Sequence, residues 1–298
     1  MAFPRGSNPR PGRWARLALV AALLGPGSCG RSGPPPTPPT GSDPATDGVL
    51  LRHAPTIAPL RHELELELTH TSLGLYLEAK VGLHASLSTA AEADGLRSTW
   101  TLEEAPTLEL VGTVEDGDRQ AVRARLSKHT SATSLADDRG VSDPDSPEPL
   151  ATEGESSRAA GLLLTAVGEQ LRLPRLPEAP LRLDTPVEQE EESETVLTDA
   201  GEVLPTTTVR RYTLRSVKEG VAEVAVELAT VAERVPAEDE PAPAEDALRM
   251  ETRAEGTLLF DLERGLPVSL ELSRSEHFEL GDQEVERSLL VRSRYRTP

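Results

Sequence analysis

The sequence is poor in cysteine, in aromatic residues and in long apolar runs. Its 298 residues include 1 Cys, 2 Trp, 3 Tyr and 3 Phe. A single cysteine excludes a disulfide within the chain. Because aromatic side chains are so few, the core of a folded domain has to be mainly aliphatic. The apolar run Leu17–Leu24 is too short to span a bilayer, which takes about 20 residues.

Signatures of catalysis and of cofactor binding are also missing. The sequence contains no glycine-rich nucleotide-binding loop, no Gly-x-Ser-x-Gly motif and no cysteine nucleophile. Its six histidines lack the spacing of a zinc site, and we expect them to face solvent on strands. They are His53, His62, His70, His84, His129 and His277. We therefore predict no catalytic residue, no cofactor and no metal site, and we do not expect an enzyme.

Basic residues are outnumbered by acidic ones. The chain has 31 Lys and Arg against 50 Asp and Glu, a formal net charge of −19. Such a chain repels the phosphates of nucleic acids, so we expect no nucleic-acid partner. The acidic runs Glu63–Glu67 and Glu188–Glu194 are weak candidates for calcium binding, but they lack the spacing and the glycine of a calcium loop. We interpret them as solvated faces.

The first 28 residues are organised like an export signal. Four arginines come first, at Arg5, Arg10, Arg13 and Arg16. The apolar run Leu17–Leu24 and the small residues of 25–28 follow. This order of a basic, an apolar and a small-residue region is typical of a secretory signal peptide. We expect residues 1–28 to be removed.

The only cysteine, Cys29, comes directly after this signal. The sequence Gly27-Ser28-Cys29 fits the site at which a lipoprotein signal is cut to leave an N-terminal cysteine that carries lipid. The alternative is an ordinary secretory signal with an incidental cysteine. Residues 29–48 are rich in Pro, Gly, Ser and Thr, which predicts a disordered tether. We expect lipidated Cys29 to hold the protein on a membrane of the bacterial cell envelope, facing the periplasm or the cell exterior.

Residues 49–298 predict a β-rich domain. Leu64, Leu66 and Leu68 alternate with glutamates, and a second alternating run continues from Leu73 to Leu87. A period of two indicates strands with one buried face, and strands of this length belong in a wide sheet. Apolar residues at helical spacing predict a helix near 156–171. We expect a mainly β (α+β) fold: a large curved antiparallel sheet or open half-barrel with one packed helix.

The clearest strand pair is a hairpin near the C-terminus. Apolar residues alternate on both sides of a tight turn that contains Gly265, a residue that can adopt positive φ. Pro267 opens the second strand, where a missing N–H costs least. We predict that Gly256, Phe260, Asp261, Gly265 and Pro267 are structural residues of this hairpin.

The run Gly256-x-Leu-x-Phe-Asp-x-x-x-Gly-x-Pro267 is similar to a hairpin in uncharacterised bacterial envelope lipoproteins. Two upstream segments, Leu176-Pro-x-x-Pro180 and Tyr212-Thr-Leu214, also resemble that family. The resemblance covers roughly residues 158–296. It implies an envelope lipoprotein with a C-terminal β-domain, and it implies no activity and no functional residues.

Two functions are compatible with these observations. The leading hypothesis is a non-enzymatic lipoprotein that binds a lipid or another apolar ligand on the aliphatic face of its sheet. The alternative is a structural or interaction lipoprotein that has a filled core and binds an envelope protein. A cavity of about 300 Å³ or more favours the first, and a filled interior favours the second.

Overall fold

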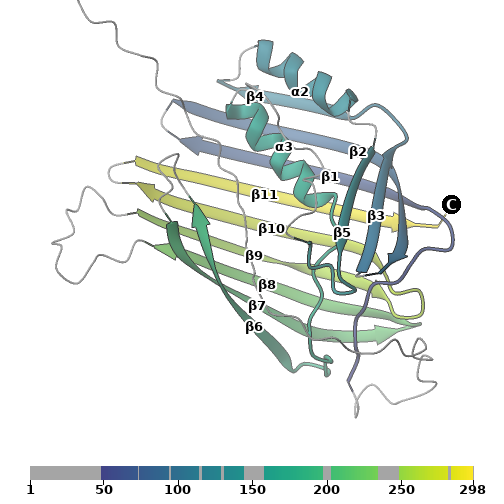
Figure 1. Ribbon diagram of the computed structural model, residues 1–298. Coiled ribbons are helices and arrows are strands. Elements are labelled where there is room, and N and C mark those ends of the chain that lie inside the picture. The colour runs from purple at the N-terminus through teal and green to yellow at the C-terminus, as the bar shows by residue number, and fades with distance from the viewer. Residues whose placement is uncertain are drawn as a thin grey trace, which may run out of the picture.

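One large sheet makes up most of the molecule (Figure 1). The computed structural model describes residues 48–72, 74–93, 95–113, 116–128, 131–143, 158–196, 203–233, 248–280 and 283–297. Its elements are β1 (Leu60–Ser72), β2 (Leu75–Glu92), β3 (Gly95–Leu102), β4 (Thr107–Gly112), α2 (Asp116–Lys128), β5 (Ser131–Ala136), α3 (Arg158–Gln170), β6 (Pro186–Val196), β7 (Val203–Lys218), β8 (Val221–Glu233), β9 (Leu248–Asp261), β10 (Leu266–Leu280) and β11 (Gln283–Arg296). The prediction of a mainly β fold is confirmed.

The strands form a single open antiparallel sheet. Their order is β5-β3-β2-β1-β11-β10-β9-β8-β7-β6, and β4 pairs with β2 beside β3. The first half of β2 pairs with β4 and its second half with β3. Because β1 lies between β2 and β11, the strands before residue 117 and those after residue 183 belong to one sheet.

Strand β1 illustrates how alternation creates two different faces. Leu66 lies opposite Val81 of β2 and Val291 of β11, and all three side chains are buried. The next residue, Glu67, lies opposite Lys80, and their charged groups are 3.8 Å apart near the surface. We call the face that carries Leu66 the inner face and the face that carries Glu67 the outer face.

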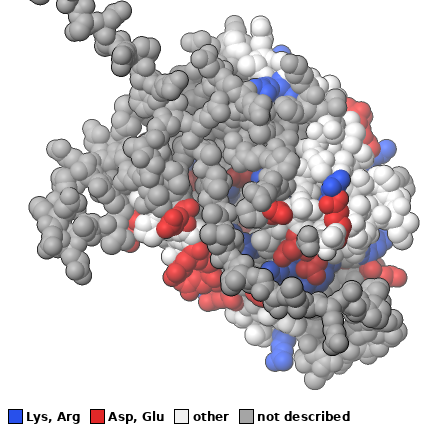
Figure 2. Space-filling model, in the orientation of Figure 1, with Lys and Arg blue, Asp and Glu red and all other residues white. Residues whose placement is uncertain are grey.

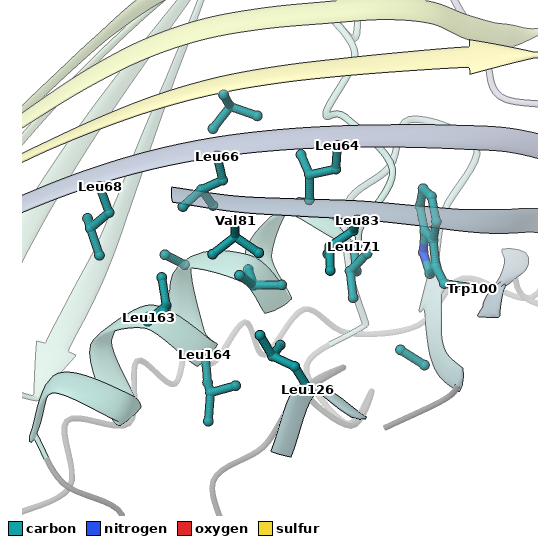
Figure 3. Close-up of a cluster of buried hydrophobic side chains, with 14 of the residues drawn as sticks. Leu64, Leu66, Leu68, Val81, Leu83, Trp100, Leu126, Leu163, Leu164 and Leu171 are labelled. Atoms are coloured by element: carbon teal, nitrogen blue, oxygen red, sulfur yellow. The ribbon is translucent and has the colours of Figure 1, made fainter. Parts of the chain in front are cut away.

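Helix α3 covers the inner face over β1 and β2, and α2 packs on α3 (Figures 1 and 3). The predicted helix near 156–171 is α3, whose Leu163, Leu164 and Val167 are buried in the main core. The expectation of one helix was incomplete, because α2 is a second helix and adds Val122 and Leu126 to the same core. Val122 and Leu126 are the only two large apolar residues of α2, so its sequence lacks the longer apolar stripe by which a helix is recognised.

Two segments outside the sheet cover another part of the inner face. Residues 49–54 and 174–183 run side by side, joined by backbone hydrogen bonds in both directions between Val49 and Leu181, of 2.7 and 2.8 Å. Their apolar side chains form a second core with strands β7, β8 and β9. This core contains Val49, Leu51, Leu176, Leu181, Tyr212, Leu214, Ala222, Val224, Leu258 and Phe260.

The segment predicted as a hairpin corresponds to the paired strands β9 and β10. Asp261 closes its turn, since its Oδ1 accepts hydrogen bonds from the backbone N–H groups of Glu263 (3.0 Å) and Arg264 (2.9 Å). Gly265 has the expected positive φ, 65°. Its carbonyl accepts a 2.9 Å hydrogen bond from the N–H of Ala54. The turn therefore holds the segment that precedes β1.

Gly256 has no room for a side chain, because a Cβ at this position would lie 2.1 Å from the carbonyl oxygen of Glu271 on β10. We expect Gly256→Ala to lower the free energy of unfolding by about 1–3 kcal/mol, measured by urea denaturation. Gly117→Ala in α2 is the control, because nothing lies within 4 Å of its added Cβ. It should be neutral or stabilising by up to about 1 kcal/mol. Equal losses in the two variants would contradict this explanation.

Candidate functional site

The residues singled out in the sequence fall into two groups. Cys29 lies outside the described residues, so its lipidation stays a prediction. The hairpin residues are structural in their geometry: Phe260 is buried in the second core, with its ring centroid 5.6 Å from that of His53. Pro267 is buried next to a shift in the β9–β10 register. None of these hairpin side chains contributes a polar group to a cleft.

The expectation that the histidines face solvent is wrong for His53, His62 and His70. Their exposed fractions are 4%, 0% and 1%. His62 and His70 alternate in phase with the leucines of β1, so the strand turns them to the inner face. His53 Nε2 donates a 2.8 Å hydrogen bond to the carbonyl of Pro174. His129 lies outside the described residues.

His62 lies in an aromatic cluster. Its ring is stacked on Tyr295 at 4.5 Å and tilted against Trp100 at 4.6 Å. Neither ring nitrogen has a hydrogen-bond partner among the described residues. Burial lowers the pKa of His62 to about 3, so the ring is neutral at physiological pH. Here histidine serves as an apolar core residue.

A row of polar side chains crosses the inner face, and the sequence analysis missed it. The residues lie directly opposite one another on seven neighbouring strands, β1, β11, β10, β9, β8, β7 and β6. In that order they are His70, Arg287, Glu276, Thr252, Thr230, Thr208 and Glu191. We call them the inner polar row. This row is polar across seven strands on the face that also carries the apolar core clusters.

Ion pairs neutralise the charges at the β10 part of the inner polar row. The carboxylate of Glu276 forms an ion pair with the guanidinium of Arg287 at 2.8 Å and a second, close ion pair with the guanidinium of Arg274. Arg274 in turn pairs at 3.0 Å with Glu169, at the end of α3. The charges on the sheet therefore tie the end of α3 to β10.

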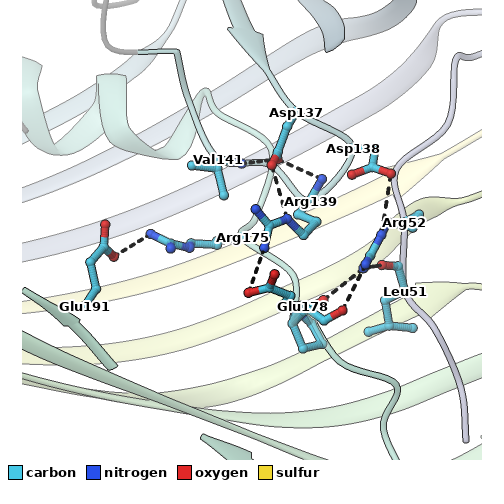
Figure 4. A network of polar contacts seen from close by, with 10 residues as sticks. Leu51, Arg52, Asp137, Asp138, Arg139, Val141, Arg175, Glu178 and Glu191 are labelled. Atoms are coloured by element: carbon cyan, nitrogen blue, oxygen red, sulfur yellow. Dashed lines mark hydrogen bonds and ion pairs between the residues drawn. The ribbon is translucent and has the colours of Figure 1, made fainter. Parts of the chain in front are cut away.

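The β6 end of the row is tied down in a similar way. Oε2 of Glu191 accepts hydrogen bonds from Arg210 of β7 (2.7 Å) and from Arg175 (2.8 Å). Figure 4 shows Arg175 and Glu191 beside a wider network that joins Arg52 to Asp138 at 3.4 Å. Burial raises the pKa of Glu191, but the hydrogen bonds and charges of the two arginines outweigh it, so the pKa is lowered.

Because the folded pKa of Glu191 is lowered, its contribution to stability is present above the unfolded pKa and is lost as pH falls through the folded pKa. We expect Glu191→Gln to lower the free energy of unfolding by about 1–2 kcal/mol at pH 7, after allowing for solvent screening. The difference from wild type should begin to shrink as pH falls below about 4, near the unfolded pKa, and should disappear only below the lowered folded pKa. Urea denaturation at pH 7 and across the acid range measures it. Glu190→Gln, an exposed neighbour on the outer face, should change stability by less than about 0.5 kcal/mol.

The apolar space under the helices is filled. The hollow between α2, α3, β2, β3 and β5 has a volume of about 10 Å³, which is no more than one water molecule needs. Its lining includes Leu83, Trp100, Leu126 and Leu171. This volume is far below the 300 Å³ that would favour an apolar ligand here.

A larger hollow lies on the outer face. Its volume is about 560 Å³, it is open to solvent, and its lining is polar. Most of its side chains come from the outer face of β1, β9, β10 and β11: Thr69, Thr71, Glu251, Arg253, Ser275, His277, Glu286 and Ser288. Such a lining suits an ion or a polar group rather than an acyl chain.

The edge strand β6 carries a run of exposed acidic side chains. Glu188, Glu190, Glu192 and Glu194 all point to the outer face and are exposed. Figure 2 shows acidic side chains gathered toward this side of the molecule. The interpretation of this run as a solvated face agrees with their exposure.

Neither helix in the described part of the chain has the length and apolar content that crossing a bilayer requires. In the comparisons with known proteins, no family model and no curated protein matches this chain. The resemblance to envelope lipoproteins therefore stays a prediction.

Proposed function

We propose that this chain is an exported, lipid-anchored protein of the bacterial cell envelope that acts by binding a protein partner, without catalysis. One observation carries the choice of a binding role over that of an apolar carrier. Two of the three apolar clusters described on the inner face are already covered, one by α3 and α2 and the other by residues 49–54 and 174–183. A carrier needs that surface for its ligand, whereas an interaction protein leaves it closed.

The anchor is supported by the order of a signal at 1–28, Cys29 and a Pro-rich tether. Growth of cells that express the full chain with an alkyne-labelled fatty acid tests it. We expect label on the wild-type chain, and no label on Cys29→Ser, because there is no second cysteine. A labelled Cys29→Ser chain, or an unlabelled wild type, would refute lipidation.

The β6 edge is the surface that best suits a partner. In the described sheet, β6 has a neighbour only on its β7 side, so its other side offers backbone groups for pairing. The acidic side chains Glu190, Glu192 and Glu194 beside this edge favour a partner with basic residues.

A photo-crosslinking amino acid at Glu190 of the anchored full chain tests this surface in cells. We expect one discrete adduct from this position and none from Tyr76, an exposed residue on β2 near the opposite end of the strand order. Changing Glu192 and Glu194 to lysine should abolish the adduct. Equal crosslinking from both positions would argue against a partner site at β6.

Native mass spectrometry of the full chain tests the alternative directly. We expect the measured mass to equal that of the lipidated chain, without a bound ligand. An additional mass that organic solvent removes, present also in Cys29→Ser, would instead establish a carried apolar ligand.

A further inference from the structure

The ends of β10 and β11 bring one histidine and three glutamates together on the outer face. His277 lies directly opposite Glu286, and Glu279 lies directly opposite Glu284. In the sequence these residues form the pairs His-x-Glu and Glu-x-Glu on two separate strands. Only the antiparallel register assembles them, which is why the histidine spacing alone gave no sign of a metal site.

The two ring nitrogens of His277 have different surroundings. Nε2 lies 3.1 Å from Oε1 of Glu279, so it donates its hydrogen to that carboxylate. The lone pair is then on Nδ1, which lies 3.5 Å from Oε1 of Glu284. A carboxylate that fixes the tautomer and orientation of a histidine is the usual support of a metal-binding imidazole.

Three possible ligand atoms lie close together. One donor atom from each of His277, Glu284 and Glu286 lies within 4.8 Å of the others. Two donors that bind one ion at about 2.0–2.2 Å lie at most about 4.4 Å apart. Since both glutamates are exposed, small side-chain rotations bring the three into coordinating positions.

The surroundings favour positive charge and leave space. The carboxylates of Glu279 and Glu284 lie 3.1 and 3.5 Å from the two ring nitrogens of His277, and Glu286 lies opposite it on β11, so negative charge gathers around the ring. His277 and Glu286 also line the open 560 Å³ hollow, which leaves room for water or for a ligand group from another molecule. An ion bound there keeps an accessible coordination position.

We propose that His277, Glu284 and Glu286 bind a divalent transition-metal ion, and that Glu279 acts as the positioning residue for His277. One imidazole nitrogen with two carboxylates suits Zn²⁺ and its neighbours, whereas Ca²⁺ takes six to eight oxygen ligands. This site is separate from the β6 edge, and its existence does not depend on the proposed partner.

Titration of the metal-free full chain in detergent with ZnCl₂, followed by isothermal titration calorimetry, tests the site. We expect one saturable Zn²⁺ per wild-type chain. His277→Ala should weaken binding by tenfold or more. Glu279→Ala should weaken it by about 10- to 100-fold although it removes no ligand, as the loss of a supporting carboxylate does.

Two variants serve as matched controls. His84→Ala removes an exposed histidine from β2, and Cys29→Ser removes the only cysteine; neither should change the affinity. Circular dichroism checks that every variant is folded. Absence of saturable binding, binding that survives His277→Ala, or binding lost in either control would overturn the proposal.

Discussion

Replacing Leu163 by alanine is expected to lower the free energy of unfolding by about 2–5 kcal/mol. Leu163 lies in the middle of α3, is fully buried, and packs in the main core beside Leu66 of β1 and Val81 of β2 (Figure 3). Removing its side chain leaves a cavity under the helix that the rigid sheet cannot close. Urea denaturation of the wild type and the variant measures the difference.

The matched control is Leu50→Ala, since Leu50 is 51% exposed and should change stability by less than about 0.5 kcal/mol. The comparison also bears on function. If α3 were a lid that leaves the inner face to admit an apolar ligand, Leu163 would contribute little to the stability of the free protein. A loss below about 1 kcal/mol would contradict the filled core on which the interaction role rests.

Burial of His62 is expected to make the folded protein sensitive to acid. Unfolding frees the ring to bind a proton with a pKa near 6.5, whereas in the folded protein the pKa is lowered to about 3. Stability is therefore complete above about pH 6.5 and is lost progressively as pH falls toward 3. We expect the titration of His62 alone to lower the free energy of unfolding by roughly 3 kcal/mol between pH 7 and pH 4. His62→Phe and His62→Leu should each remove that part of the acid sensitivity.

The measurement is the change in unfolding free energy from pH 7 to pH 4, so any packing cost common to both pH values cancels. His84→Phe is the control, because His84 is exposed on β2 and should leave the pH dependence unchanged. His53 contributes in the same direction, since burial lowers its pKa to about 4 against the smaller raising effects of the Pro174 carbonyl and Asp137. An unaltered pH profile in both His62 variants would show that its ring is not buried as described.

Much of the fold follows from local sequence patterns. Alternation predicted β1, β2 and the hairpin of β9 and β10, and helical spacing predicted α3. The same alternation indicated that His62 is buried, because His62 is in phase with Leu64 and Leu66. The prediction failed there because residue type was given more weight than position along the strand. For a residue that is neutral when buried, strand phase is the stronger signal.

Other features depend on relationships between distant segments. Strand β5 has small and polar residues in place of an apolar alternation, and it is recognised only by its backbone pairing with β3. The inner polar row requires the register of seven strands, and each strand contributes one residue that is unremarkable by itself. The cluster around His277 likewise needs the pairing of two strands. Sequence periodicity within one segment cannot reveal such sets.

The position of β1 between β2 and β11 has a consequence for biogenesis. Ten described strands precede β11 in the chain, so β1 cannot obtain its second neighbour until all of them have been synthesised. Contacts so distant along the chain form slowly, and unpaired edges are prone to aggregate in the meantime. A chain that stalls before β11 exposes the edges of β1 and β10 together, and two unpaired strand edges on one chain invite pairing with other chains.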